Sequence, residues 1–412
     1  MTAPRLTAAV TGLGLVTAAG VGAEVAWRGV TQPSAVKGVR HQDELRGLSC
    51  DFMYTVDDLD TVSLLGVPAL RMMDRFSQLA VIAAREAVAD AGLDTSVWET
   101  DRIAVVIGSA HGGLPFYDQQ SAVLAEKGAR RVSPKLAPMT TVNSAASSVC
   151  MDLGARGPSL SVSTACSSGT VAIGTALQLL RSGACDVVIA GGAESVCSRL
   201  LIASACQMRA VSTRRDDPST ACRPFDADRD GFVVGEGAGL VVLERPDHAV
   251  ARGARVRAGI AGYGASSDAH AAVAPEPEGK GIERALRTAL DDAGVTPADV
   301  GHVNAHGTST VMNDLIEATM LRRVLGEEPL VTSTKPMTGH TLGAAGGIET
   351  ALTVLALERQ LVPPTANFQT RDIRIPIDVV TKEARAAEFE CAVKISMGFG
   401  GHNAALVLTK GC

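Results

Sequence analysis

An internal repeat constrains the fold of this chain more than any other feature of its sequence. An apolar run broken by Gly-x-Gly at 9–16 recurs at 258–265, and a segment of helical period that stops at Gly92 recurs with its end at Gly294. Three more pairs of segments match in the same order: 107–113 with 303–309, 174–180 with 349–355, and 235–244 with 398–408. Five matches in one order predict two copies of one structural unit.

The two copies define the expected domains and their architecture. We expect an N-terminal half over 1–255 and a C-terminal half over 256–412. The strands expected at 103–108, 186–192 and 239–244 are continuous apolar runs, which are typical of strands covered on both faces by helices. A layered α/β fold is therefore predicted. The chain is 46% hydrophobic but only 3% aromatic, so its core must consist mainly of aliphatic side chains.

Composition and charge argue against several classes of protein. A net charge of −6 without a long Lys/Arg run argues against nucleic-acid binding. No uninterrupted apolar span reaches the length that a membrane helix needs. The apolar N-terminal stretch resembles a signal peptide, but glycines interrupt it and it recurs later in the chain, so we expect no secretion. Nine cysteines without a C-x-x-C pair indicate free thiols in a reducing cytoplasm.

Cys166 is the first candidate for a functional residue. It lies in the stretch STACSSG, after a short apolar strand and before a predicted helix of about four turns. The N-terminus of a helix carries unpaired N–H groups and a positive dipole end, which favour a thiolate over a thiol. The small residues around Cys166 leave room for an acyl group. Taken alone, Cys166 fits a buried structural cysteine equally well.

Two histidines and a lysine lie in similar surroundings in the second half. His306 follows a predicted strand in NAHGTSTVMND, and Lys335 and His340 lie in STKPMTGH ahead of another helix. His302 and His306 could be read as metal ligands, but no third ligand lies nearby in the sequence. We therefore expect no metal site.

At these segments the chain resembles the β-ketoacyl-[acyl-carrier-protein] synthases, the elongating type II condensing enzymes of fatty-acid and polyketide synthesis. The motifs STACSSG, HGTSTVMND, STKPMTGH with LGAAGG, and MGFGGHN occur in the family's order and spacing. Residues 221–244 are also closely similar, and only the region 30–70 fits loosely. The resemblance implies the thiolase fold, a duplicated five-layered αβαβα structure, which agrees with the repeat.

The resemblance also implies a reaction. Cys166 would accept an acyl chain from acyl carrier protein as a thioester. A malonyl thioester would then lose carbon dioxide, and the resulting enolate would attack the acyl-cysteine to give a 3-oxoacyl product. His306 and His340, as neutral imidazoles, would stabilise the charge that develops on the malonyl thioester.

Further site residues follow from the resemblance. The backbone N–H groups of Cys166 and Phe399 would form an oxyanion site. Lys335 would support the two histidines with Glu349 as its ion-pair partner, although a charge pair that holds a loop fits almost as well. The residues expected to bind substrate are Thr308, Thr310, His111, Glu349 and Gly400. The basic residues expected to contact the acidic carrier protein are Arg71, Arg130, Arg131 and Arg209.

The chain departs from the family's usual pattern at several positions. His402, Met397 and Pro336 stand where the family commonly has threonine, an aromatic residue and serine. His111 falls where the family often has an apolar residue in the wall of the acyl pocket. A polar imidazole at that position favours a shorter, unsaturated or functionalised acyl substrate over a long saturated chain.

Other functions fit the sequence less well. A thiolase needs a second catalytic cysteine near the C-terminus, and the stretch GFGGHN offers none. A non-catalytic chain-length subunit would lack the nucleophile that Cys166 provides. A dinucleotide-binding loop would need glycine at position 17, where Thr17 stands, and no G-x-S-x-G segment indicates a hydrolase. Housekeeping fatty-acid elongation stays the alternative to polyketide synthesis.

The resemblance implies two kinds of partner. Acyl carrier protein would deliver its own phosphopantetheine arm, so we expect no resident cofactor. A second ketosynthase subunit would pair through the strand that precedes Cys166. That subunit would be either a second copy of this chain or a chain-length-factor-like relative.

Overall fold

The strands of the two predicted halves form two matching parts of one large sheet. The computed structural model describes residues 6–32, 38–57, 59–94 and 98–411. Across the N-terminal part the strands are, in order, β6 (Ser159–Val162), β5 (Ile103–Gly108), β7 (Val187–Glu194), β8 (Gly237–Glu244) and β1 (Ala8–Thr17). Across the C-terminal part, inside the short edge strand β13 (Asp378–Val379), they are β11 (Leu330–Thr332), β10 (Val300–Asn304), β15 (Cys391–Gly398), β16 (His402–Lys410) and β9 (Ala258–Ser267).

Strand direction repeats as well as strand order. In each part the first three strands run parallel, and the remaining pairings are antiparallel. The two parts join where β1 pairs with β9 over residues 8–10. The predicted internal repeat is therefore confirmed. The boundary between residues 255 and 256 falls just before β9 and stays a prediction.

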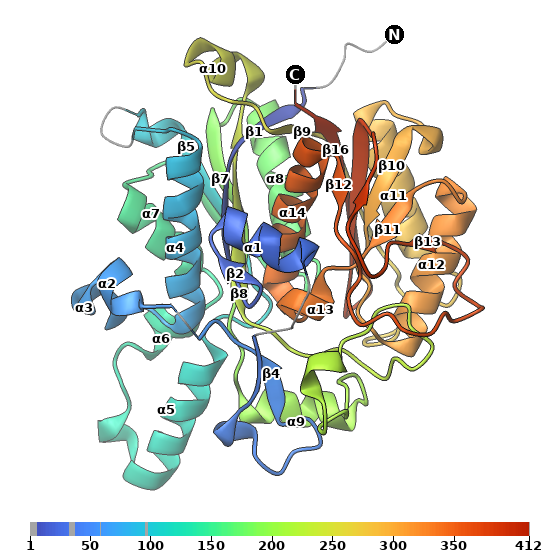
Figure 1. Ribbon diagram of the computed structural model, residues 1–412. Coiled ribbons are helices and arrows are strands. Elements are labelled where there is room, and N and C mark those ends of the chain that lie inside the picture. Colours follow the sequence, from blue (N-terminus) through green and yellow to red (C-terminus); the bar gives the residue numbers. More distant parts are fainter. Residues whose placement is uncertain (1–5, 33–37, 58, 95–97, 412) are drawn as a thin grey trace.

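Helices complete five layers, which Figure 1 shows side by side. The outer face of the N-terminal part is covered by α4 (Arg75–Asp90) and α7 (Ser144–Leu153). Between the two parts lie α8 (Ser168–Arg181) and α14 (Ala345–Arg359), whose apolar side chains contact both. The outer face of the C-terminal part is covered by α11 (Lys280–Ala293) and α12 (Val311–Leu325). This is the αβαβα arrangement that the sequence predicts.

The repeated Gly-x-Gly has one physical cause in both halves. A Cβ added to Gly12 or Gly14 would lie within 2.0 Å of a backbone oxygen of α4. A Cβ added to Gly262 or Gly264 would lie within 2.2 Å of a backbone oxygen of α11. Glycine is therefore required because helix and strand lie so close together, and β1 continues through this motif as a strand rather than as a nucleotide-binding loop.

Further elements surround the five layers. The remaining helices are α1 (Ala23–Thr31), α2 (Thr61–Leu65), α3 (Val67–Leu70), α5 (Leu114–Lys127), α6 (Leu136–Thr140), α9 (Arg199–Gln207), α10 (Pro246–Ala251) and α13 (Lys335–Thr338). The remaining strands are β2 (Gly20–Val21), β3 (Val39–His41), β4 (Phe52–Tyr54), β12 (Leu361–Val362) and β14 (Arg385–Ala386). Among the described residues, no helix has the length and apolar character to cross a membrane.

Candidate active site

Cys166 lies on a tight turn between β6 and α8, two residues before the helix begins at Ser168. The preceding Ala165 has a φ of +51°, a left-handed conformation that costs energy for a residue other than glycine. Ser168 holds this turn, because its Oγ donates to the Ala165 carbonyl at 2.6 Å and accepts from the Thr164 N–H at 2.9 Å. The turn therefore fixes the thiol, which is 7% exposed, at the base of a cavity.

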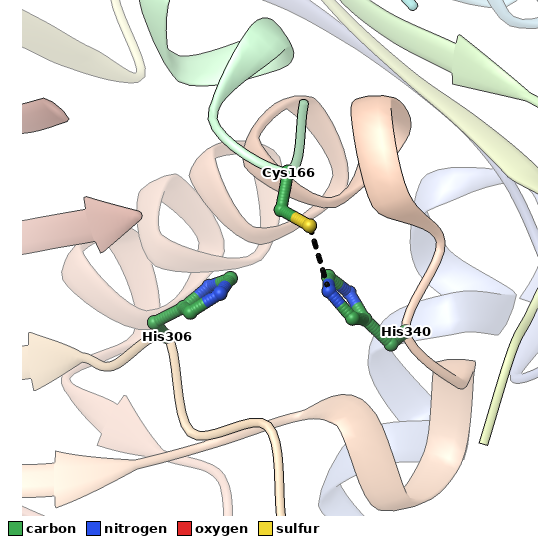
Figure 2. A group of neighbouring side chains, drawn as sticks. All are labelled: Cys166, His306 and His340. Carbon is green, nitrogen blue, oxygen red and sulfur yellow. Dashed lines mark hydrogen bonds between the residues drawn. The ribbon is translucent and has the colours of Figure 1, made fainter. Parts of the chain in front are cut away.

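His306 and His340 from the C-terminal half lie next to this thiol, as Figure 2 shows. The Cys166 Sγ lies 3.2 Å from His340 Nε2. The two imidazole rings lie edge to face, with centroids 5.4 Å apart. One ligand atom from each of the three residues lies within 4.8 Å of the others. The structure thus brings together the three residues that the sequence singled out, from two different halves of the chain.

Backbone hydrogen bonds hold both histidines in position. His306 follows β10, and the buried Glu317 of α12 accepts its N–H at 2.5 Å and that of Gly307 at 2.7 Å. His340 follows α13, and its N–H donates to the Val233 carbonyl at 2.8 Å. The sequence analysis missed Glu317, since a glutamate on a helix carries no local sign that its carboxylate is buried.

A buried charge cluster of Lys335, Glu349 and Lys394 lies behind the imidazoles. Lys335 Nζ donates to the Glu349 carboxylate and to the His306 carbonyl. Lys394 Nζ lies 2.7 Å from the other carboxylate oxygen of Glu349. All three side chains are fully buried. The ion pair expected between Lys335 and Glu349 is present, whereas Lys394 was missed, although a lysine inside the apolar run 391–398 was an available signal.

The charge cluster helps to keep the histidines neutral. Burial lowers the pKa of His306 and of His340 well below the usual value, and the positive charges of Lys335 and Lys394 lower both further. A histidine with a lowered pKa stays uncharged at neutral pH. Each ring can therefore donate one hydrogen bond as a neutral imidazole, the state that the family resemblance implies.

The state of the thiol differs from the sequence-based prediction. Burial raises the pKa of Cys166 to about 11, although the charge of Lys335 and the backbone N–H groups of Phe399 and Cys166 lower it. The prediction that the helix N-terminus favours a resting thiolate is therefore wrong, because loss of hydration outweighs it. The resting group is a neutral thiol, and its sulfur lies 3.2 Å from His340 Nε2.

A cavity of about 640 Å³ extends from the thiol. Eight lining residues belong to or pack against the hydrophobic cluster that contains Cys166, and we call them the apolar wall: Ala110, Leu201, Ile202, Ala205, Ala210, Phe232, Val234 and Leu342. The predicted site residues that line the cavity are Cys166, His306, His340, Phe399, Thr308, Thr310, His111 and Arg209. Polar lining residues that the sequence analysis missed are Ser163, Asp230, Asp268, Asn313 and Asn403.

Other predicted site residues lie away from the cavity. Glu349 was expected to contact substrate, but it is buried in the charge cluster behind the histidines. Gly400 lies between two lining residues and is not part of the lining itself. Arg71, Arg130 and Arg131 are exposed and do not line the cavity. Of the four predicted carrier contacts, the structure brings only Arg209 to the cavity.

Fold and site together define a class of enzyme. A buried thiol faces two neutral imidazoles between two copies of one α/β unit. This arrangement is typical of an acyltransferase that uses a catalytic thiol and has the thiolase fold. The N-terminal domain of the β-ketoacyl synthase family matches residues 7–249, and the C-terminal domain of that family matches residues 257–369. This chain belongs to the β-ketoacyl synthase family.

Relatives of this chain agree with that assignment over nearly its whole length. The 3-oxoacyl-[acyl-carrier-protein] synthase 2 of Staphylococcus aureus (strain COL) is 42% identical over 409 residues, which cover 97% of each chain. The solved ishigamide ketosynthase/chain length factor has a TM-score of 0.90 at 33% identity, covering 98% of this chain and 99% of that one. A second solved structure is a type II polyketide acyl-carrier protein in complex with its ketosynthase, bound to the hexaketide. Its TM-score is 0.87 at 31% identity, and it covers 98% of this chain and 99% of that one.

These similarities confirm the thiolase fold and the enzyme class. The chain is a 3-oxoacyl-[acyl-carrier-protein] synthase, an acyltransferase that condenses a malonyl group with an enzyme-bound acyl group and releases carbon dioxide.

Proposed function

We propose that this enzyme elongates carrier-bound acyl chains in type II polyketide synthesis, with Cys166 as acyl acceptor and His306 and His340 as the decarboxylation pair. The observation that carries this proposal is the 3.2 Å distance between Cys166 Sγ and His340 Nε2, with a second neutral imidazole beside it. Lys335 is a positioning residue in this scheme, because it donates to the His306 carbonyl and does not line the cavity.

The first step transfers the acyl group to the enzyme. As Cys166 Sγ forms a bond to the thioester carbonyl carbon, its proton passes toward the departing pantetheine sulfur, while His340 keeps the N–H on its Nε2. The carbon–sulfur bond of the carrier thioester then breaks, and the departing pantetheine sulfur takes that proton, which leaves His340 neutral. We assign the oxyanion of this step to the backbone N–H groups of Cys166 and Phe399. Both groups lower the pKa of the Cys166 thiol.

The second step uses both imidazoles as hydrogen-bond donors. The malonyl thioester carbonyl accepts from His306 and His340 while the bond to the carboxylate breaks, so that carbon dioxide leaves and an enolate forms. The enolate carbon then bonds to the acyl carbon on Cys166. The carbon–sulfur bond to the enzyme breaks, and solvent returns a proton to the sulfur. The product is a 3-oxoacyl chain on the carrier protein.

We propose that the phosphopantetheine arm of acyl carrier protein supplies both substrates and that no resident cofactor takes part. The hydroxyls of Thr308 and Thr310 line the cavity and lie 2.9 Å apart, where amide groups of the arm could bond to them. Arg209 is exposed at the same cavity and is our proposed contact for an acidic carrier. A similar solved ketosynthase was captured with its carrier protein. The other proposed carrier contacts are Arg71, Arg130 and Arg131.

We also propose that the enzyme works as a dimer in the cytoplasm. Strand β6 ends the N-terminal part of the sheet and, among the described residues, pairs on one side only, with β5. An unpaired strand edge is a template for another strand. Two similar solved ketosynthases were determined with a chain length factor, so the second subunit is a copy of this chain or such a relative.

The proposed compartment rests on the cysteines. The described cysteines are all free, and thiols stay reduced in the cytoplasm.

Housekeeping fatty-acid elongation is the second candidate function. The 42% identity to 3-oxoacyl-[acyl-carrier-protein] synthase 2 favours it. The polyketide assignment is favoured by His111, which puts a polar group into a cavity that a saturated chain would occupy.

Two variants of Cys166 test the proposed roles. Cys166→Ala should abolish condensation, because no sulfur accepts the acyl group. Cys166→Gln should also abolish condensation but should leave malonyl decarboxylation running, since His306 and His340 are intact. Release of labelled carbon dioxide from malonyl carrier protein, measured beside product formation, separates the two steps. Condensation by either variant would contradict the proposal.

A further inference from the structure

Tyr54 is a fully buried tyrosine that contacts the turn on which His340 lies. It is the last residue of β4 and has no exposed surface. The region around it resembles the family only loosely, so no motif points to this residue. A Cβ added to Gly339, the residue before His340, would lie 2.7 Å from the tyrosine ring. The ring therefore packs directly against the backbone of the turn.

The Tyr54 hydroxyl bonds to α13 at the point where the chain leaves this helix. It donates to the Pro336 carbonyl at 2.7 Å. In a continuing α-helix that carbonyl would accept the N–H of His340, four positions later. The His340 N–H donates instead to the Val233 carbonyl at 2.8 Å. The tyrosine thus satisfies an acceptor that would otherwise compete for the backbone of His340.

The backbone of Tyr54 pairs with the same short segment that holds His340. The Tyr54 N–H donates to the Val234 carbonyl at 2.9 Å, and the Glu236 N–H donates to the Tyr54 carbonyl at 3.0 Å. From the other side of the segment, the Gly235 N–H donates to the His340 carbonyl at 3.0 Å. The segment therefore lies between Tyr54 and His340 in a narrow ladder.

The imidazole of His340 depends on this turn for its position. Its Nδ1 is buried and makes no hydrogen bond among the described residues, so no polar group holds the ring from behind. The ring contacts Phe232 edge to face, with centroids 5.1 Å apart, and its Nε2 lies 3.2 Å from Cys166 Sγ. A shift of the backbone at residue 340 would therefore be passed on to Nε2.

We propose that Tyr54 is a positioning residue for His340, which holds the turn after α13 so that Nε2 reaches the malonyl thioester carbonyl. This inference rests on the proposed function, in which His340 donates a hydrogen bond during decarboxylation. Tyr54 does not line the cavity, so it acts through His340 rather than on the substrate. Without its hydroxyl, the Pro336 carbonyl competes for the His340 N–H and the turn shifts. Acyl transfer relies on other groups, the N–H groups of Cys166 and Phe399, and should change little.

Tyr54→Phe, which removes the hydroxyl and keeps the ring, tests this proposal in the full-length protein. Decarboxylation is measured as labelled carbon dioxide released from malonyl carrier protein, with Cys166→Gln present so that condensation does not interfere. We expect kcat to fall by roughly tenfold and KM to change by less than about twofold, because only the position of a catalytic group is altered. Loading of native Cys166 from acyl carrier protein, followed by mass spectrometry, should stay within about twofold of the native rate.

Thr11→Val is the matched control, because it also removes a buried hydroxyl that makes a hydrogen bond, here to Glu244 at 2.5 Å. Glu244 is the last residue of β8, whereas the segment that contacts His340 precedes the first residue of that strand. Thr11→Val should lower the thermal midpoint about as much as Tyr54→Phe does and should leave both reaction steps unchanged.

Several outcomes would overturn the role of Tyr54. These are a Tyr54→Phe variant that keeps the native decarboxylation rate, one whose loss lies in KM, one that slows both steps equally, or one that unfolds far below Thr11→Val. The same selective loss in Thr11→Val would also overturn it. His340→Ala separates this failure from a failure of the proposed function. Decarboxylation that survives in His340→Ala contradicts the proposed function, whereas a loss in His340→Ala but not in Tyr54→Phe contradicts only the role of Tyr54.

Discussion

At the scale of single residues, one carboxylate organises the charges around the catalytic pair. Glu349 contacts Lys335 through one oxygen and Lys394 through the other. When both lysines are protonated, their two charges exceed the single charge of the buried glutamate. An excess of positive charge then lies next to His306 and His340. Because that charge opposes protonation of the imidazoles, it extends the pH range in which they can donate hydrogen bonds as neutral rings.

Removal of Lys394 should therefore change the pH dependence of condensation. A lowered histidine pKa means that activity is lost only at low pH, when the imidazoles finally become charged. Lys394→Met takes away one positive charge, so the pKa values of His306 and His340 rise and the acidic limb of the rate profile moves to higher pH. The ratio of the rate at pH 5 to the rate at pH 8 should be lower in the variant than in the native enzyme, because burial and Lys335 still keep both pKa values below the ordinary value.

The variant Lys394→Arg keeps the charge and should retain the native profile. Lys410→Met on the neighbouring β16 removes an exposed lysine and serves as the control. The measurement is kcat/KM for condensation between pH 5 and pH 9. An acidic limb at the same pH in Lys394→Met and the native enzyme would show that Lys394 has only a structural role.

At the scale of elements, contact between helix and strand depends on the repeated glycines. A Cβ on Gly14 would lie 1.8 Å from the Ala83 carbonyl oxygen, a distance that no side-chain rotation can relieve. Gly14→Ala should thus force α4 away from β1 and destabilise the fold by about 1–3 kcal/mol. Thermal unfolding should show a clearly lower midpoint, whereas Ala89→Ser on the exposed face of α4 should leave it nearly unchanged. An unchanged midpoint in Gly14→Ala would contradict the packing account.

Elements with strong local signals could be predicted, and those that depend on distant contacts could not. The sequence predicts a strand over 103–108, and β5 covers Ile103–Gly108. It predicts a helix after Cys166, and α8 begins at Ser168. The charge state of Cys166 was mistaken because burial arises from residues far away in the chain, and no local motif encodes it. Glu317 was missed for the same reason.

At the scale of the whole molecule, strand β6 is the exposed edge of the described sheet that lies nearest to the nucleophile. Leu160 in the middle of this strand is 40% exposed although it is a large apolar residue. If β6 pairs with a second subunit, Leu160→Arg should put an unpaired charge into that interface and weaken it strongly. Sedimentation velocity should then show a smaller species, and condensation should fall with it because the turn at Cys166 follows β6 directly.

Leu200→Arg is the control for this substitution, since Leu200 is 71% exposed on α9 and lies outside the proposed interface. It should sediment like the native protein. A native protein that sediments as a monomer, or a Leu160→Arg variant that keeps the native size, would contradict the proposed assembly.

Mass spectrometry of a single acyl transfer tests the central claim most directly. The full-length enzyme is incubated with acyl carrier protein that bears an acyl chain, and the mass of the Cys166 peptide is followed before and after malonyl carrier protein is added. We predict one acyl group on Cys166 that disappears upon addition of malonyl carrier protein, with release of carbon dioxide and appearance of the 3-oxoacyl carrier. An acyl group on another residue, or one on Cys166 that malonyl carrier protein cannot remove, would contradict the account.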